Sequence, residues 1–531
     1  MYDLLIKNGT IVDGTGAPRF KGDVAVENGL IAKIAPVICE PAKRILDAKG
    51  LIVSPGFIDT HTHSDMILFN PNTTGYNHLE DGATTELAGQ CGSFSAPYYG
   101  EYNPTCGVSQ EEFAKICESY TSFFEFAESI PHGPNQAYFA GQGPIRGKVM
   151  GFGEGTPNEE QLQQMRDLMQ EAMECGALGF STGLVYTPSV FAGTEELIEI
   201  AKVAHKYGGV YTTHIRGEGN QLKESIEEAL VIGRASGIPV NISHIKVIGH
   251  HNEGKSQEII EWLDENRKAG MTIWADQYPF TGGSAPLIAQ IPPKYLTEGK
   301  EIGLKKLVES AELRQQAEWS IFNEPDEFES NIFSAGYEGC LIAGAYKTQE
   351  HLGKTIAQLA EEWGKAPFDT VVELLAQNEG IVQGIYFAQN QSDLLNFLAQ
   401  PWVMGGSDWS DYAETVDPET HAGGHPRAMA TLVHRLELIR DNGIESLESA
   451  IHRITALPAK VYDLPSIGML KEGMAADITV FDYAGLKCNA DYDFPYRKNE
   501  GIKYVIVNGG IAVENGTFTG LKNGKVLRKG K

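Results

Sequence analysis

Two histidines, His61 and His63, follow a short apolar run at residues 53–58. If this run forms a β-strand, side chains two positions apart point to the same side, so both imidazoles can reach one point. Imidazole is the commonest protein ligand for metal ions such as Zn²⁺. The pair indicates the opening of a metal site, although His-x-His alone is weak evidence unless further ligands accompany it.

Other potential ligands also follow apolar runs. They are Cys91, His214, His244 and Asp408, and the runs that precede them are 84–88, 209–213, 240–243 and 402–405. A single cysteine is usually a small core residue, but nitrogen, sulfur and oxygen donors after five separate runs together predict a metal centre. Imidazole and thiolate with a carboxylate nearby favour Zn²⁺.

The elements that would position these residues alternate along the middle of the chain. The predicted strands are 53–58, 84–88, 136–139, 177–180, 209–213, 240–243, 272–276 and 402–405. Amphipathic stretches at 158–175, 195–207, 222–236 and 256–268 follow the start and stop rules of helices. This alternation predicts an α/β fold, a (β/α)₈ TIM barrel, in which catalytic residues lie at the carboxyl ends of the strands.

Both ends of the chain are instead rich in short strands and glycine turns. The predicted N-terminal strands are 4–7, 10–12, 23–27 and 30–34, with hairpin signals at Asn8-Gly9 and Asn28-Gly29. The C-terminal region has the same character, with strands around Asn508-Gly509. We expect a small β-sandwich domain of residues 1–54 plus 470–531, a catalytic barrel of residues 55–469, and an insertion at 286–345 that forms a lid or subdomain.

Composition limits the possible partners and the compartment. The chain has 531 residues and a net charge of −27, so it repels nucleic acid and anionic membranes, and local cations must hold any anionic substrate. No signal peptide and no apolar stretch of about 18 residues are evident. Seven scattered cysteines do not suggest a disulfide framework. We expect a cytoplasmic enzyme, and its oligomeric state stays open.

The motifs as a group resemble a known family. Residues 55–63, Pro-Gly-Phe-Ile-Asp-Thr-His-Thr-His, with single histidines after the fifth and sixth strands and Ser407-Asp408 after the eighth, resemble the amidohydrolase superfamily. Many of its members carry a carboxylated lysine after the fourth strand, which is missing here. Residues 89–97, Gly-Gln-Cys-Gly-Ser-Phe-Ser-Ala-Pro, are instead similar to the cysteine-ligand motif of the D-aminoacylase (N-acyl-D-amino-acid deacylase) branch. Further segments that resemble this branch are 176–184, 243–246 and 425–427.

The resemblance implies a zinc-dependent hydrolase of N-acyl-D-amino acids. It implies that Cys91, His214 and His244 hold the tighter Zn²⁺, and that His61 and His63 belong to a second, weaker site. Asp408 would face both metals, take the proton of the attacking water and deliver it to the leaving amine. Cys91 could bridge the two metals in place of the carboxylated lysine.

The resemblance also assigns the substrate's α-carboxylate to a set of binding residues. These residues are Lys246, Tyr278 and Ser284, with Arg427 as a further candidate. The preference for D-amino acids follows from the resemblance alone, because nothing in composition or spacing determines chirality.

Two other functions remain open. A cyclic-amide hydrolase of the dihydroorotase or hydantoinase kind would generally use the carboxylated lysine, so the Cys91 motif argues against it. A non-catalytic scaffold that kept the barrel without its chemistry would have lost ligands, and none of the candidate ligands is missing here.

Overall fold

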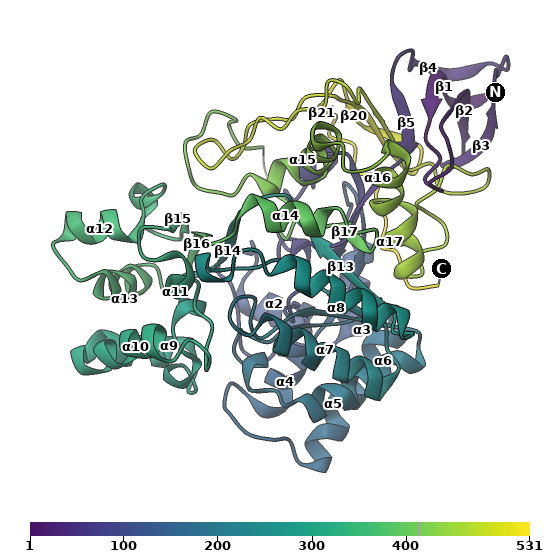
Figure 1. Ribbon diagram of the computed structural model, residues 1–531. Helices are drawn as coiled ribbons and strands as arrows, with labels where there is room; N and C mark the ends of the chain where they lie inside the picture. The colour runs from purple at the N-terminus through teal and green to yellow at the C-terminus, as the bar shows by residue number, and fades with distance from the viewer. Residues whose placement is uncertain (413–414, 531) are drawn as a thin grey trace.

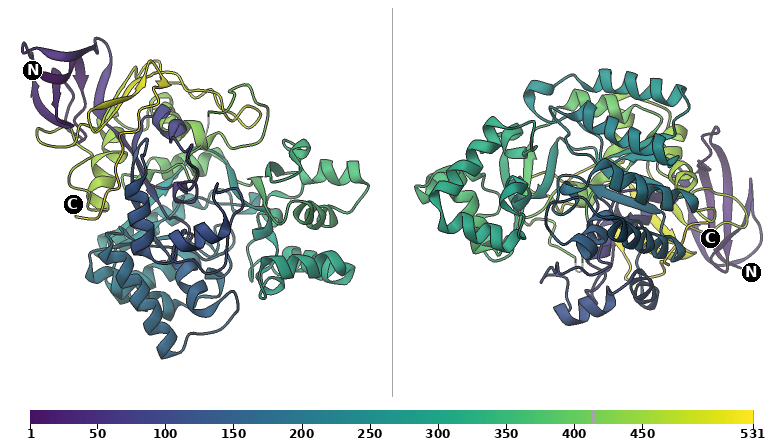
Figure 2. Two further views of the ribbon diagram at one scale, coloured as in Figure 1. Left: turned by 180° about the vertical axis from the view of Figure 1, so that it is seen from behind. Right: turned by 90° about the horizontal axis from the view of Figure 1, so that it is seen from below.

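The computed structural model describes residues 1–412 and 415–530; residues 413–414 and 531, which fall within the expected barrel and terminal ranges, lie outside the described part. Figure 1 shows three parts: a central barrel, a sheet built from both chain ends, and a separate lobe that contains α9–α13. Figure 2 shows the same lobe on the opposite side of the barrel from the N-terminus.

The central part is the predicted (β/α)₈ barrel. Its strands are β6 (Phe57–Asp59), β7 (Ala83–Ala88), β8 (Asn135–Tyr138), β10 (Gly179–Gly183), β11 (Val210–His214), β12 (Val240–Ile242), β13 (Ile273–Gln277) and β17 (Val403–Gly405). They pair in parallel as β6-β7-β8 and as β10-β11-β12-β13-β17, and the short β9 (Ala140–Gly141) continues β8 and pairs with β10. The backbone N–H of Thr60 donates to the Gly405 carbonyl at 3.1 Å, which joins the first strand to the last.

Helices cover the outside of this barrel, and the four helices expected from amphipathic patterning all form. The helices are α1 (Tyr76–Glu80), α2 (Gln110–Ile116), α3 (Tyr120–Ser129), α4 (Gln142–Met150), α5 (Glu159–Glu174), α6 (Thr194–Lys206), α7 (Leu222–Ser236), α8 (Ser256–Lys268), α14 (Gln391–Leu398), α15 (Arg427–Asn442), α16 (Leu447–Arg453) and α17 (Ala456–Val461). Across the described ranges, every helix is too short or too polar to cross a membrane.

Both chain ends contribute strands to one sheet. These strands are β1 (Tyr2–Ile11), β2 (Phe20–Glu27), β3 (Leu30–Ala35), β4 (Ala42–Asp47), β5 (Ile52–Pro55), β18 (Ile478–Phe481), β19 (Ile502–Val507), β20 (Gly510–Glu514) and β21 (Thr517–Phe518). β5 pairs with β1 on one side and with β18 on the other, so the two ends of the chain meet at this strand. Apolar side chains from both ends, such as Leu4 and Ile506, share one core.

The Asn-Gly pairs at which hairpin turns are expected do not all form turns. Asn28-Gly29 and Asn508-Gly509 form the expected hairpin turns, with positive φ at all four residues. Asn8-Gly9 does not form a turn, and the prediction there was wrong. β1 continues through it with a shift of register against β2, while the Asn8 N–H donates to Asp23 Oδ1 at 2.8 Å. Asn8 has a φ of 62°, and a residue in this conformation accommodates a β-bulge as well as a turn.

The inserted lobe contains a small antiparallel sheet and its own core. Its elements are β14 (Gly282–Pro286), α9 (Lys300–Glu309), α10 (Ala311–Asn323), α11 (Asn331–Ala335), β15 (Cys340–Ala345), α12 (Ile356–Trp363), α13 (Pro367–Gln377) and β16 (Val382–Phe387). β16 lies between β14 and β15 in the sheet. Because β16 follows the expected insertion of residues 286–345, we propose that the inserted unit spans residues 282–387.

Candidate active site

His61 and His63 lie beyond the end of β6 rather than on it. The strand ends at Asp59, so the alternation of side chains along a strand does not bring the two rings together. Instead, the N–H of Thr62 donates to the Leu87 carbonyl at 2.9 Å and the N–H of His63 donates to the Trp409 carbonyl at 2.8 Å. These bonds to β7 and to the loop after β17 hold the segment at the barrel mouth, where the ring centroids of the two histidines lie 5.7 Å apart.

Sharp turns at strand ends present the remaining candidate ligands. His214 is the last residue of β11. Cys91, His244 and Asp408 follow β7, β12 and β17 with φ values of 53°, 35° and 53°, in the left-handed region that side chains other than glycine rarely adopt. Residues in this region cluster at functional sites, where the surrounding structure maintains the strain.

The six predicted ligands form two groups that share Cys91. The Cys91 Sγ lies 3.3 Å from His61 Nε2 and 3.3 Å from His244 Nε2. Ligand atoms of Cys91, His214 and His244 lie within 4.8 Å of one another, and so do those of His61, His63, Cys91 and Asp408. Donors from five strand ends therefore converge on one sulfur atom.

Two buried carboxylates, those of Asp276 and Glu218, contact the Nδ1 atoms of His61 and His244. Asp276 Oδ1 lies 2.9 Å from His61 Nδ1 and also accepts the backbone N–H of His244 at 2.7 Å. Glu218 Oε1 lies 3.1 Å from His244 Nδ1. In each case Nδ1 is engaged and Nε2 is left facing Cys91, which is how carboxylates commonly orient histidine ligands of a metal.

Sequence reasoning missed both carboxylates. Asp276 ends the predicted strand 272–276, and a carboxylate at the end of an apolar strand is the signal that could have identified it. Glu218 lies in the loop after β11, where no periodic pattern marks it.

The electrostatics of the mouth favour a bound cation. Burial raises the pKa of the Cys91 thiol, but the charges of His61 and His244 bring it well below its usual range. Burial likewise raises the pKa of Asp408, and the Arg427 guanidinium brings it well below the ordinary carboxyl value. A thiolate and a carboxylate are thus held in a buried site, and the donor set of thiolate, imidazole and carboxylate fits Zn²⁺.

The predicted substrate-binding residues line a cavity of about 1700 Å³ that opens on this centre. Arg427 Nη1 lies 2.8 Å from Asp408 Oδ2, and its guanidinium lies 4.6 Å from the Tyr278 ring centroid. Lys246 Nζ lies 2.5 Å from Glu218 Oε1, so its charge has a partner within the protein. Ser284, on β14, donates its hydroxyl to the Gly384 carbonyl at 3.0 Å.

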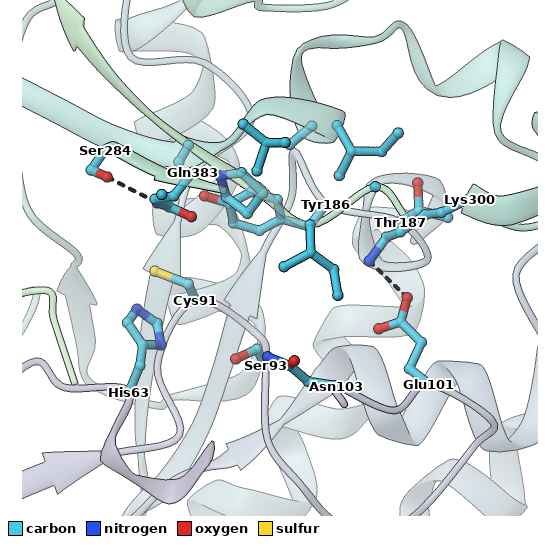
Figure 3. A pocket seen from close by; sticks show the side chains of 18 of the residues that line it. His63, Cys91, Ser93, Glu101, Asn103, Tyr186, Thr187, Ser284, Lys300 and Gln383 are labelled. Atoms are coloured by element: carbon cyan, nitrogen blue, oxygen red, sulfur yellow. Dashed lines mark hydrogen bonds and ion pairs between the residues drawn. The ribbon is translucent and has the colours of Figure 1, made fainter. Parts of the chain in front are cut away.

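The inserted lobe forms the far wall of the cavity. Figure 3 shows His63 and Cys91 at one end and the ion pair of Lys300 with Glu101 at the other. Lys300 begins α9 and lies 2.7 Å from Glu101, which is in the loop after β7. Gln383, on β16, donates to the Ser284 hydroxyl at 2.8 Å. The lobe and the barrel therefore enclose the cavity together.

A third buried group, formed by His78, Glu86 and Asp411, lies outside the cavity lining. His78 Nδ1 lies 2.9 Å from Glu86 Oε1 and 3.4 Å from Asp411 Oδ1. The Asp411 backbone N–H donates to the hydroxyl of Ser64, next to His63, at 3.1 Å. Burial raises the pKa of both the Glu86 and the Asp411 carboxyl groups. The group is therefore a buried polar network that connects the loops after β6 and β17.

Comparison with known proteins agrees with this geometry. Residues 142–513 match a family described as "Amidohydrolase family". The chain is 32% identical over 530 residues to a D-aminoacylase of Alcaligenes xylosoxydans xylosoxydans, with 99% of this chain and 98% of the relative covered. A crystal structure of a D-aminoacylase matches with a TM-score of 0.82 and 30% identity over the full length of both chains. An N-acyl-D-glutamate deacylase from Bordetella bronchiseptica, complexed with zinc and a phosphonate inhibitor, matches with a TM-score of 0.81 and 29% identity over 99% of both.

Proposed function

The chain belongs to the amidohydrolase family, and we propose that the barrel mouth described above is where it hydrolyses N-acyl-D-amino acids. It is a metal-dependent amide hydrolase. The names of its full-length relatives support linear N-acyl-D-amino acids, rather than cyclic amides, as its substrates. The observation that carries the proposal is the convergence of two ligand groups on Cys91 with Asp408 beside them.

The proposed metal ligands follow from the two groups. We propose that Cys91, His214 and His244 would hold the tighter Zn²⁺ and that His61 and His63 would belong to a second, weaker site. Proximity of the ligand atoms within each group supports the two sets. Cys91 belongs to both groups, which supports a bridging role for its thiolate in place of a carboxylated lysine. Orientation of His61 by Asp276 and of His244 by Glu218 supports both assignments.

Asp408 is the proposed general base and acid. When bound, Zn²⁺ acidifies water and polarises the amide carbonyl. Asp408 is ionised because Arg427 lies against its carboxylate, so it can accept the water proton and then deliver that proton to the nitrogen of the leaving amine. The products are a carboxylate and a free D-amino acid.

The α-carboxylate of the substrate is assigned to Arg427, Lys246, Tyr278 and Ser284, all of which line the cavity. Arg427 and Lys246 are the buried cations of this lining, with 3% and 8% exposure. Arg427 already pairs with Asp408, and Lys246 already pairs with Glu218. A negative charge on the substrate's side chain, in addition to its α-carboxylate, would therefore find no unpaired buried cation among these two. The rest of the lining includes Ile288, Val382 and Tyr386. We therefore propose that the amino acid carries an uncharged side chain.

A substrate panel tests this function. The zinc-loaded wild type and Asp408→Ala would be assayed with N-acetyl derivatives of D- and L-leucine, -phenylalanine, -glutamate and -aspartate, together with dihydroorotate and hydantoin. We expect turnover of the neutral D-compounds, and a loss of about 10²- to 10⁴-fold in kcat for Asp408→Ala. The zinc content of the variant is measured alongside, because Asp408 is also a candidate ligand of the second metal group. Turnover confined to L-compounds or to cyclic amides, or full activity of the variant, would contradict the proposal.

The expected compartment and partners complete the proposal. We propose that the enzyme is cytoplasmic and acts on small-molecule substrates. We further propose that it binds neither nucleic acid nor membranes, and its net charge of −27 supports this second point.

A further inference from the structure

Glu329 connects the inserted lobe to the loop after β11. It lies in the segment between α10 and α11, and its carboxylate faces the backbone of the barrel loop rather than another side chain. Glu329 Oε1 accepts the N–H of Glu218 at 2.7 Å, and Oε2 accepts the N–H of Gly219 at 2.6 Å. A Cβ atom at Gly219 would lie 2.9 Å from Oε2, so the close approach depends on glycine there.

The residue held in this way is itself bound to the active site. Glu218 is buried, with 7% of its surface exposed, and its Oε1 contacts Lys246 Nζ at 2.5 Å and His244 Nδ1 at 3.1 Å. The Glu218 carbonyl accepts the N–H of Ile248 at 3.0 Å, which ties the loop to the segment after β12. A shift of the Glu218 backbone would therefore move the partner of a proposed substrate-binding lysine and of a proposed zinc ligand.

Holding Glu329 in this position has an electrostatic cost. Burial raises the pKa of its carboxyl to about 7, the charge of Glu218 adds to the effect, and the two backbone N–H groups oppose it. Charge-assisted hydrogen bonds to two adjacent amides are short and directional. A residue whose role was only to fill space between the lobe and the barrel would not need a carboxylate here.

We propose that Glu329 is a positioning residue: it fixes the backbone at Glu218 so that the Glu218 carboxylate holds Lys246 for substrate binding and orients His244, a proposed zinc ligand. The docking of the inserted lobe is thereby linked to the affinity for substrate. The inference rests on the proposed function, because Lys246 is taken to bind the substrate's α-carboxylate.

Steady-state kinetics on the zinc-loaded, full-length enzyme test this link. In preparations loaded to the same zinc content as the wild type, Glu329→Ala should raise KM for the best N-acetyl-D-amino acid by about tenfold, with a smaller change in kcat. Glu329→Gln keeps one acceptor oxygen and should restore part of the loss. Asp326→Ala is the matched control, because Asp326 lies in the same segment and accepts only an exposed hydrogen bond from Asn220, at 3.1 Å. Unchanged KM in Glu329→Ala, or equal losses in both alanine variants, would overturn the proposal.

Hydrogen exchange provides a readout that does not depend on catalysis. In Glu329→Ala, a peptide covering residues 216–221 should exchange faster than in the wild type, whereas Asp326→Ala should leave the exchange of Glu218 and Gly219 unchanged. Unchanged exchange in Glu329→Ala would contradict the positioning role even if the wild type hydrolysed none of the panel. An inactive wild type with faster exchange in that variant would contradict the proposed function alone.

Discussion

At the scale of single residues, Cys91 is the residue that both groups of candidate metal ligands share. Its sulfur lies 3.3 Å from the imidazoles of His61 and His244, which follow β6 and β12, and its left-handed backbone directs it into the mouth. The nearby histidine charges keep the thiol ionised despite its burial. A thiolate of this kind is a metal ligand, whereas a neutral buried thiol would be a small apolar side chain.

Replacing this thiolate should remove zinc. We predict that Cys91→Ala binds markedly less zinc than the wild type after equal dialysis, because it removes the one donor shared by both ligand groups. Metal content measured by plasma mass spectrometry checks this. Cys175→Ala is the control thiol, because Cys175 is the C-cap residue that follows α5 and does not line the cavity, so its loss should leave the zinc content unchanged. Equal zinc in both variants would remove Cys91 from the ligand set.

At the scale of elements, the first predicted strand divides into two. Residues 52–55 form β5 in the terminal sheet, and residues 57–59 form β6 in the barrel. Gly56 lies between them, and a Cβ atom there would lie 2.1 Å from Thr84 Oγ1. The chain can pass from one sheet to the other at this point only because the residue has no side chain.

Gly56→Ala should therefore destabilise the protein. We expect a cost of about 1 to 3 kcal/mol or more from overpacking against Thr84, seen as a thermal unfolding midpoint several degrees lower. Gly153→Ala is the matched control, because a Cβ at Gly153 would have its nearest neighbour at 3.9 Å. A Gly56→Ala midpoint equal to that of the control would show that β6 moves freely to make room.

At the scale of the whole molecule, buried polar groups join the terminal sheet to the barrel. Asp477, just before β18, accepts the Asn508 N–H at 2.7 Å and the Asn135 side-chain amide at 2.8 Å. Asn135 begins β8, and Asn508 lies in the turn between β19 and β20. The carboxylate thus links one barrel strand to a hairpin at the far end of the chain.

The ionisation of Asp477 should make stability depend on pH. Burial raises its pKa to about 6 in the folded protein, above the ordinary carboxyl value of about 4. The folded state then binds this proton more tightly than the unfolded state, so the contribution is present at low pH and is lost as the pH rises from about 4 to about 6, by about 1.4 kcal/mol per pH unit. Urea unfolding of wild type and Asp477→Asn across this range should show a difference that changes with pH. A difference that is constant with pH would contradict the shifted pKa.

Local patterns were sufficient for most of the barrel. The helices from Glu159 to Lys268 were predicted nearly to the residue, because their amphipathic faces and glycine stops are local signals. The Asn8-Gly9 prediction failed because an asparagine with positive φ suits a bulge as well as a turn, and only pairing with β2 selects between them. β16, which we propose belongs to the inserted unit, pairs with β14 and β15 at a distance in sequence, so no local pattern marks where that unit ends.

The sequence by itself determined which residues are candidates for the chemistry, because ligand types at the ends of successive apolar runs can be recognised without coordinates, and the structure brings their ligand atoms together. His61, Cys91, His214, His244 and Asp408 were identified in this way. Only the tertiary structure decided how they are supported. Asp276 orients His61, Glu218 pairs with Lys246, and Glu329 reaches Glu218 from the inserted lobe. Such contacts join residues far apart in the chain, and their hydrogen bonds depend on how closely packed elements bring the atoms together, which no spacing along the sequence encodes.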